Sequence, residues 1–306
     1  MAVRKNTASS ANSLFIKPKD NTGAWRIGTS GWSYPASAGP GTWTGVFYPL
    51  KKTDELRFYS RYFNTVEINS TFYRPCSAKT AESWVGRTPD DFEFTIKAWQ
   101  QFTHARSPLS REEIEEFRQG IAPLGEAGKL GAILFQFPAS FHCTDDAIDR
   151  LRALLDAFEG YTAVVELRHR SWGDYMDELI QMNAVPAFID EPKFHDSIRQ
   201  ALGLHRGMLY LRFHGRNAGK WWRHEHRSER YDYLYSKEEI ESYAGRLKEM
   251  SADKIIRKAY IFFNNHPGAK AVANAVLLRA LLDVPVEELL PQTLVDAFPD
   301  LKIGSS

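Results

Sequence analysis

The stretch "VEINSTFYR", residues 66–74, alternates apolar and polar side chains before it reaches two aromatic residues and an arginine. Alternation with a period of two is typical of a β-strand, whose successive side chains point to opposite faces. Glu67 and Asn69 therefore share one face, and Val66 and Ile68 share the other. What the polar face meets depends on the strands that follow.

Short apolar runs of the same kind bring the number of candidate strands to eight. They are residues 25–32, 63–71, 92–99, 131–138, 162–170, 184–190, 208–216 and 259–266. Segments with helical spacing lie between them, and two carry start signals: a capping-box pattern at Ser110 and Glu113, and a capping Thr144. Eight strand-and-helix repeats favour a (β/α)8 TIM barrel over an open doubly wound sheet, and no Gly-x-Gly-x-x-Gly opens a helix.

Composition and charge narrow the class of protein. With 306 residues, 43% of them hydrophobic, the chain can bury one large core, which we place in a single domain over residues 24–300. The polar segment 1–23 lacks a signal-peptide core and is predicted to be a disordered tail. No apolar run is long enough to span a membrane, and a net charge of +1 gives no overall attraction to anionic surfaces. Two distant cysteines, Cys76 and Cys143, argue against a disulfide scaffold and favour the cytoplasm.

Polar residues recur on the inward faces expected for the barrel strands. Besides Glu67 and Asn69, the alternation points eight side chains inward: Lys97, Gln136, Glu166, Arg168, Asp190, Arg212, His214 and Asn264. Burying a charge without a partner costs several kcal/mol, so these groups either pair with one another or await a ligand. Both interpretations stay open, although a network built only for packing would more simply be aliphatic.

A divalent metal and an anion are the two ligand classes that such a lumen suggests. Hard or borderline metal ligands are available at Glu67, Glu166, Asp190, His214 and His104. No local spacing such as His-Glu-x-x-His supports a metal, and Lys97, Arg168 and Arg212 would repel a cation. They favour an anionic or phosphate-bearing ligand. No organic cofactor is predicted, and a divalent metal stays a candidate.

A loop of mixed charge follows the seventh strand: "GRNAGKWWRHEHRSERYDYLYS", residues 215–236. Its arginines are interleaved with Trp221, Trp222 and Tyr231, a combination that can stack bases or sugars while holding phosphate. The alternative is a surface flap whose tryptophans pack on the barrel rim. His224 and His226 are expected to be solvated rather than to bind a ligand.

Several stretches together resemble the YecE-like family, also called domain of unknown function 72. They are "GTSGWSYP" with "FYP", "VEINSTFYR", "FTIKAW" followed by "TH", "LFQFP", "VVELRHRSW", "YLRFHGR" with "RYDYLYS", and "FFNNH". The resemblance runs in order from about residue 25 to residue 270 and implies a TIM barrel, loosely similar to sugar isomerases and to metal-dependent apurinic endonucleases. It implies no reaction of its own. The first loop, residues 33–49, is longer than is usual in the family.

The matching motif positions extend the candidate site to Tyr73, His104, His169, Trp172 and Asn265. We expect an enzyme, a hydrolase, lyase or isomerase, that acts on a sugar- or phosphate-containing substrate at the carboxyl ends of the strands. The predicted catalytic residues are Glu67, Lys97, Glu166 and His214. The predicted substrate-binding residues are Asn69, Tyr73, His104, Gln136, Arg168, His169, Trp172, Asp190, Arg212, Asn264 and Asn265.

Two alternative functions stay open at this point. One is a nucleic-acid phosphodiester enzyme that uses the basic and aromatic loop. The other is a non-catalytic barrel that binds a small anion. The expected partner is a small anionic or sugar molecule, with nucleic acid as the alternative, and no membrane.

Overall fold

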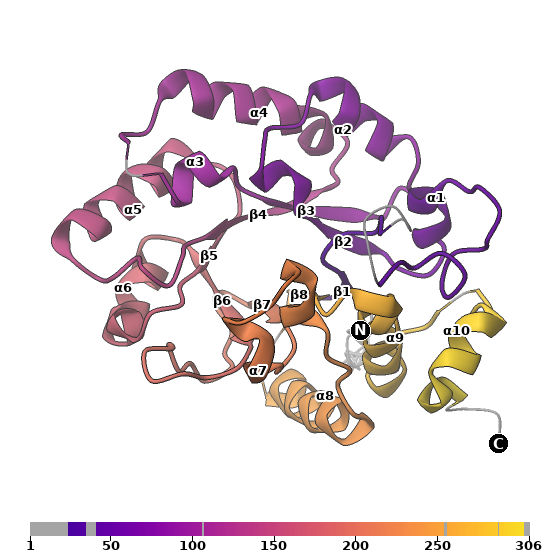
Figure 1. Cartoon of the computed structure of the whole chain (residues 1–306). Coiled ribbons are helices and arrows are strands. Elements are labelled where there is room, and N and C mark those ends of the chain that lie inside the picture. The colour runs from indigo at the N-terminus through magenta and orange to yellow at the C-terminus, as the bar shows by residue number, and fades with distance from the viewer. Residues whose placement is uncertain (1–23, 35–40, 106, 254–255, 287, 303–306) are drawn as a thin grey trace, which may run out of the picture.

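Eight parallel strands form the centre of the fold (Figure 1). The computed structural model describes residues 24–34, 41–105, 107–253, 256–286 and 288–302, so the predicted tail of residues 1–23 lies outside the described residues. The strands are β1 (Trp25–Thr29), β2 (Thr65–Ile68), β3 (Glu93–Lys97), β4 (Leu130–Gln136), β5 (Ala163–Glu166), β6 (Val185–Asp190), β7 (Met208–Phe213) and β8 (Lys258–Phe263). Each lies within a predicted apolar run or within one residue of it.

The strands close into a barrel. They are hydrogen-bonded in the order β1-β8-β7-β6-β5-β4-β3-β2, and every pair is parallel. The ring is completed between β1 and β2 by an isolated bridge from Ser30 to Glu67, where the Gly31 N–H donates to the Glu67 carbonyl at 2.8 Å. The predicted (β/α)8 TIM barrel is confirmed.

Helices surround the barrel (Figure 1). They are α1 (Glu55–Tyr59), α2 (Ala78–Val85), α3 (Gln100–Thr103), α4 (Arg111–Glu126), α5 (Asp145–Ala157), α6 (Met176–Gln181), α7 (Ala218–Trp221), α8 (Lys237–Asp253), α9 (Lys270–Leu281) and α10 (Gln292–Ala297), with 3-10 turns at Ser70–Phe72, Arg170–Tyr175, Arg227–Tyr231, Pro267–Ala269 and Pro299–Lys302. Both predicted caps are present: Ser110 Oγ accepts from Glu113 N, and Thr144 Oγ1 accepts from Ala147 N, each at 3.3 Å. The alternation of strand and helix breaks once, because residues 191–207 between β6 and β7 contain no helix.

The interior of the barrel has an apolar layer below a polar one. Buried apolar side chains inside the barrel form one cluster: Ala132, Leu134, Val164, Val185, Ala187, Tyr210, Tyr260 and Phe262. The next inward positions on β4, β5 and β7 are Gln136, Glu166 and Arg212. The apolar layer closes the lumen from below, so the polar groups are reached from the carboxyl ends of the strands.

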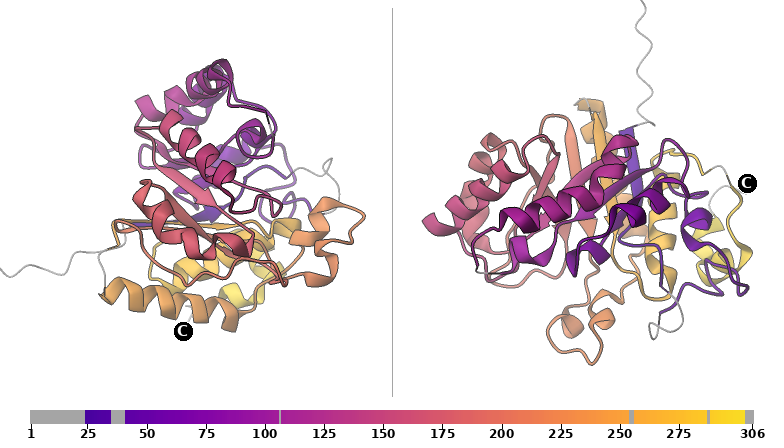
Figure 2. Two further views of the ribbon diagram at one scale, coloured as in Figure 1. Left: turned by 90° about the vertical axis from the view of Figure 1, so that its left-hand side faces the viewer. Right: turned by 90° about the horizontal axis from the view of Figure 1, so that it is seen from above.

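A flap, residues 217–235, follows β7 and contains α7 and the turn Arg227–Tyr231. Figure 2 shows part of this segment projecting beyond the rest of the ribbon at one end of the barrel. Its Trp221 side chain is buried, whereas Trp222 is 64% exposed. One tryptophan therefore packs, as the rim interpretation expected, and the other is presented to solvent.

None of the helices in the described part of the chain is long and apolar enough to cross a membrane.

Helix α4 contains two glycines that offer a matched test of its packing. A Cβ on Gly120 would lie 2.1 Å from the Cys76 carbonyl oxygen, whereas a Cβ on Gly125 would meet nothing within 4 Å. We predict that Gly120→Ala lowers the free energy of unfolding by about 1–3 kcal/mol through overpacking. Gly125→Ala should raise it by up to about 1 kcal/mol through helix propensity. Urea denaturation of both variants measures the difference, and equal effects would contradict the assigned packing.

Candidate functional site

One arginine joins two glutamates across the polar layer. Arg212 of β7 is buried, and its Nε and Nη2 donate to the Oε2 and Oε1 atoms of Glu67 at 2.9 and 2.6 Å. Its Nη1 donates to Glu166 Oε2. A guanidinium presents its donors in a planar fork that matches carboxylate geometry, so this arrangement satisfies Glu67 bidentately and Glu166 by a single bond.

A second arginine completes the neutralisation of Glu166. Arg168 donates from Nε and Nη2 to Glu166 Oε1 at 2.8 and 2.6 Å, and its Nη1 lies 3.1 Å from Glu191 Oε2. Burial by itself would raise the carboxyl pKa values, but Arg212 outweighs it. The pKa of Glu67 is held below its ordinary value, and that of Glu166, which also faces Arg168, well below. Both glutamates are therefore ionised.

His214 is neutral and its tautomer can be assigned. Its Nε2 lies 3.3 Å from both Arg212 Nη1 and Arg168 Nη2, which can only donate, so Nε2 accepts. The proton then resides on Nδ1, which lies 3.0 Å from the side-chain amide of Asn264. That amide must present its oxygen to Nδ1, since the two amide atoms are distinguished only by their hydrogen bonds. Burial, followed by Arg212, lowers the histidine pKa.

The acceptor capacity of the glutamates is largely used within the protein. Ser30 Oγ and Tyr210 OH each donate to Glu67 at 2.8 Å, in addition to the two bonds from Arg212.

Among the residues that the structure describes, no three His, Cys, Asp or Glu side chains form a group suited to a metal ion. The divalent metal considered from the sequence thus lacks a ligand set in this part of the chain.

A cavity of about 710 Å³ opens above this network. Its walls come from the carboxyl ends of the strands and from the flap. Lining residues include Tyr34, Asn69, Phe72, Tyr73, Lys97, His104, Gln136, Arg168, Arg212, His214, Trp221, Trp222, Arg230, Tyr231, Asn264 and His266. The volume is within the range of small-molecule sites, and the polar groups converge on it.

Lys97, at the end of β3, differs from the arginines because it has no counter-ion among the described residues. Its Nζ lies 4.0 Å from the centroid of the Phe72 ring, and no hydrogen bond or ion pair joins it to another described residue. Burial, followed by the charge of Arg212, lowers the lysine pKa to about 7. The amine is therefore divided between its charged and neutral forms near neutral pH.

Arg230 of the flap is the second unpaired cation of this cavity within the described residues. Its guanidinium lies over the Trp221 and Tyr231 rings, 5.6 and 6.0 Å from their centroids. Its Nε is buried without a hydrogen-bond partner. No hydrogen bond or ion pair joins the Arg230 guanidinium to another described residue, so an anion in the cavity would supply an acceptor that the protein does not.

Residues 26–297 match the family described as "Protein of unknown function DUF72". The chain belongs to the DUF72 family. It is 31% identical over 287 residues to the UPF0759 protein YunF of Bacillus subtilis, covering 88% of this chain and 98% of that protein. It is 31% identical over 116 residues to the UPF0759 protein YecE of Escherichia coli K12, covering 37% of this chain and 41% of that one.

Two solved DUF72 structures share the fold. The protein from Thermotoga maritima is 32% identical with a TM-score of 0.73, covering 84% of this chain and 98% of that chain. The protein from Enterococcus faecalis is 25% identical with the same TM-score, covering 87% and 98%. The family predicted from the sequence motifs is confirmed, and the barrel agrees with its solved members.

Most residues predicted for the site meet at the mouth of this DUF72 barrel. Nine line the 710 Å³ cavity: Asn69, Tyr73, Lys97, His104, Gln136, Arg168, Arg212, His214 and Asn264. Glu67 and Glu166 lie buried in the network described above. His169 borders an adjoining cavity of about 510 Å³, where its ring stacks on His142 at 3.8 Å.

Three predicted residues face away from the cavity. Asp190 accepts from Tyr235 and Tyr243 at 2.6 Å and from Arg216 at 2.9 Å, on the side of β6 that α8 covers. The prediction that Asp190 points inward is wrong, because the inward alternation on β6 runs through Val185 and Ala187, which places Glu191 at the mouth instead.

Asn265 and Trp172 are likewise held by the protein itself. The Asn265 amide donates to the Tyr233 carbonyl and to Asn274 Oδ1 of α9, both at 2.8 Å. Trp172 is fully buried, and its Nε1 donates to the Phe141 carbonyl at 2.7 Å. These contacts indicate that both residues position loops at the barrel rim.

Sequence reasoning missed Glu191, which holds Arg168, and Ser30 and Tyr210, which hold Glu67. Counting the β6 alternation from Ala187 would have found Glu191, and Tyr210 shares the face of Arg212. Ser30 offered no sequence signal, since its contact with Glu67 arises only when β1 and β2 close the barrel.

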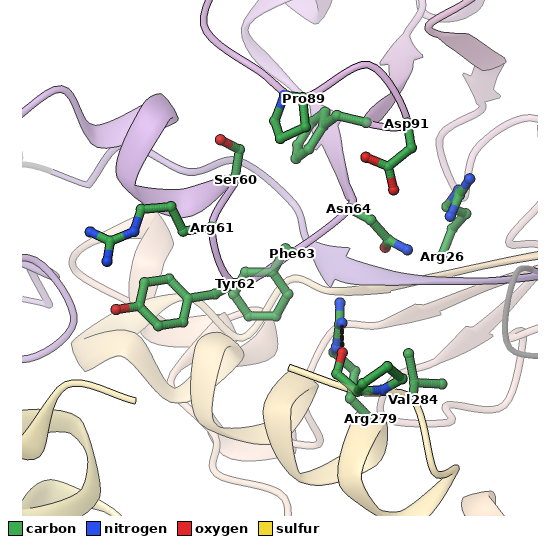
Figure 3. A pocket seen from close by; sticks show the side chains of 12 residues that line it. Arg26, Ser60, Arg61, Tyr62, Phe63, Asn64, Pro89, Asp91, Arg279 and Val284 are labelled. Carbon is green, nitrogen blue, oxygen red and sulfur yellow. Dashed lines mark hydrogen bonds between the residues drawn. The ribbon is translucent and has the colours of Figure 1, made fainter. Parts of the chain in front are cut away.

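A separate hollow of about 280 Å³ lies at the amino ends of the strands (Figure 3). It is lined by the start of β1, the turns before β2 and β3, and the end of α9. Its Arg26 and Arg61 are already paired, with Glu93 and Glu288, each at 2.9 Å. TIM-barrel chemistry gathers at the opposite, carboxyl end, so this hollow is not the candidate site.

Removal of Arg212 should leave the buried carboxylate of Glu67 without a charged partner and take one of the two arginines from Glu166. We predict that Arg212→Met lowers the free energy of unfolding at pH 7 by about 3–5 kcal/mol. Without Arg212, Glu67 keeps only the neutral donors Ser30 and Tyr210, so burial would raise its pKa and folding would favour its protonated form. The deficit relative to wild type should therefore shrink as the pH falls from 7 towards 4.5.

Chemical denaturation at pH 7 and pH 5 measures this trend. Arg216→Met is the control, because it removes an ion pair with Asp190 that is partly exposed and lies outside the barrel. Its deficit should be smaller than that of Arg212→Met at pH 7. An Arg212→Met deficit that is the same at both pH values would contradict the assigned network.

Proposed function

We propose that this chain is an enzyme that binds a sugar- or phosphate-containing substrate in the 710 Å³ cavity. The observation that carries the proposal is a difference between two sets of cations. Arg168 and Arg212 are already paired with carboxylates, whereas Lys97 and Arg230 line the same cavity without a counter-ion among the described residues. An anionic group is the ligand that would pair with them.

Proton transfer is best assigned to the cavity wall. Glu67 and Glu166 are ionised and bonded to arginine, which supports a positioning role for them over the general acid or base role expected from the sequence. Lys97, with a pKa of about 7, is matched to work near neutral pH. His104 on the same wall is neutral, because burial, and then the charge of Lys97, lowers its pKa to about 4.

Other groups of the wall suit the uncharged part of a sugar. Asn69 lines the cavity, and a side-chain amide can exchange hydrogen bonds with a hydroxyl. Tyr73 and Trp222 are aromatic residues that are 62% and 64% exposed and line the cavity. Apolar faces beside polar acceptors fit a molecule with hydroxyls on one side and C–H groups on the other.

Anion binding should depend on Arg230. We predict that Arg230→Gln weakens sulfate binding roughly tenfold or more, since hydrogen bonds to charged groups contribute about 1.5–3 kcal/mol. Arg223→Gln is the matched control, because Arg223 lies on the same flap but is exposed and does not line the cavity. Isothermal titration calorimetry with sodium sulfate measures both. Equal weakening by the two variants would refute a specific role for Arg230.

The protonation of Lys97 gives the binding a pH signature. Lys97 is charged below its pKa of about 7 and neutral above it, so sulfate affinity should fall between pH 6 and pH 8. Sulfate keeps its own charge over this range, which leaves the protein as the source of the change. Lys97→Met should bind more weakly at pH 6 and lose most of the pH dependence. A variant with the wild-type pH profile would contradict this assignment.

A nucleic-acid phosphodiester enzyme is the second candidate. The observation in its favour is that the 710 and 510 Å³ cavities share Arg168, Trp221 and Trp222 as lining residues, so a ligand longer than one sugar can be accommodated. We predict that binding of a single-stranded oligonucleotide would then weaken steeply with salt, through counterion release. Fluorescence anisotropy at 50 and 200 mM salt tests it, and a flat response would exclude this candidate.

A non-catalytic barrel that only captures an anion is the third candidate. It would return its ligand chemically unchanged, which mass spectrometry of the recovered ligand detects.

The proposed location stays the cytoplasm. It is supported by two free cysteines, Cys76 and Cys143.

A further inference from the structure

We propose that Lys97 is a nucleophile that forms an imine with the aldehyde or ketone group of a phosphorylated open-chain sugar. The inference rests on the proposed function and deepens it, because it names the reacting carbon and the substrate class. It also narrows the reaction to an isomerase or a lyase, since an imine activates the C–H or C–C bond next to it and serves no purpose in simple hydrolysis.

The position of Lys97 suits this role. It is the last residue of β3, at the carboxyl end of the barrel where substrate arrives, and it lines the 710 Å³ cavity. Its Nζ contacts the face of Phe72 at 4.0 Å, and no carboxylate of the described residues lies within 4.0 Å of it. A carboxylate partner would stabilise the charged form of the amine, so its absence makes the lone pair easier to free for attack.

Other lysines of the chain are engaged in ways that Lys97 is not. The buried Lys129 donates from Nζ to the Val85 carbonyl and to both oxygens of Thr88. Lys220 and Lys258 are ion-paired with Glu229 and Glu93 at 2.8 and 2.5 Å. Lys97 therefore combines partial burial at a cavity wall with the absence of a counter-ion among the described residues, and these two conditions together distinguish it.

The charges around Lys97 favour its neutral form. Burial and the neighbouring Arg212 and Arg168 lower the pKa, while Glu166 and Glu67 oppose the shift, with a net pKa of about 7. Roughly half of the amine is then neutral at pH 7, against roughly one part in three thousand for an ordinary lysine. Desolvation and an adjacent cation are recognised ways of activating a lysine for imine formation.

The covalent step balances without an external oxidant or reductant. The Nζ lone pair attacks the carbonyl carbon, a C–N bond forms, and the carbonyl oxygen takes a proton, while the nitrogen loses one. The carbinolamine then breaks its C–O bond, and the hydroxyl leaves with a further proton as water. The resulting iminium carbon draws electrons from the neighbouring bond. The phosphate of the substrate would pair with Arg230, which the imine does not consume.

Reductive trapping tests the proposal on the full chain. The protein is incubated at pH 7.5 with glyceraldehyde 3-phosphate or dihydroxyacetone phosphate and sodium cyanoborohydride, which delivers hydride to the iminium carbon. Peptide mass spectrometry then locates the secondary amine. We expect the adduct on Lys97 at least tenfold above the adducts on Lys129 and Lys193, which serve as internal controls within one wild-type sample. Equal labelling of all three lysines, or no adduct on Lys97 with either probe, overturns the proposal.

A charge-preserving variant adds a second criterion. Lys97→Arg keeps a cation at the cavity wall but should form no adduct, while its sulfate affinity at pH 8 stays at or above that of wild type. If the total amount of adduct on the protein is the same in Lys97→Arg as in wild type, the adduct does not form on Lys97 and the proposal is overturned. Sulfate titration of wild type distinguishes the failure of the imine from the failure of the proposed function. If sulfate binds but no adduct is trapped, the imine is ruled out and the proposed function stands. If neither sulfate binding nor an adduct is observed, both are ruled out.

Discussion

A single buried guanidinium, that of Arg212, ties three strands together inside the barrel. Through it, β7 holds Glu67 of β2 and Glu166 of β5. Charges placed in a protein interior are tolerated only when they are paired and hydrogen-bonded, and here the glutamates also receive Ser30, Tyr210 and Arg168. The network thus fixes the polar layer in position directly above an apolar one.

The pairing also decides what the cavity offers to a ligand. Arg168 and Arg212 donate hydrogen bonds to carboxylates of the protein, and neutral His214 accepts from both arginines. These paired groups form a preorganised floor of the cavity. Lys97 belongs to a strand and Arg230 to the flap. Both line the cavity and keep donors for an incoming molecule. Groups held in place before binding lose little freedom when the ligand arrives, which is the general advantage of a preorganised site.

The barrel could be predicted from the sequence because each strand is a compact apolar run and two of the helices between them begin at the recognisable caps Ser110 and Thr144. Inward polar positions followed from alternation on β2, β3, β4, β5 and β7. The failure at Asp190 has a physical cause: it stands next to Glu191, both are acidic, and only the parity of the preceding β6 residues separates them. The flap could not be placed from sequence, because its contacts depend on where β7 and β8 bring Trp221 and Arg230.

The most direct measurement is a crystal structure of the protein soaked in selenate, whose anomalous signal locates the anion. We expect a peak in the mouth cavity within hydrogen-bonding distance of Arg230, with Arg212 still bonded to Glu67 and Glu166. A selenate bound directly by Arg212, with its glutamates displaced, or a mouth cavity without any anomalous peak, would contradict the claim that the buried network is complete and leaves the wall to bind the ligand.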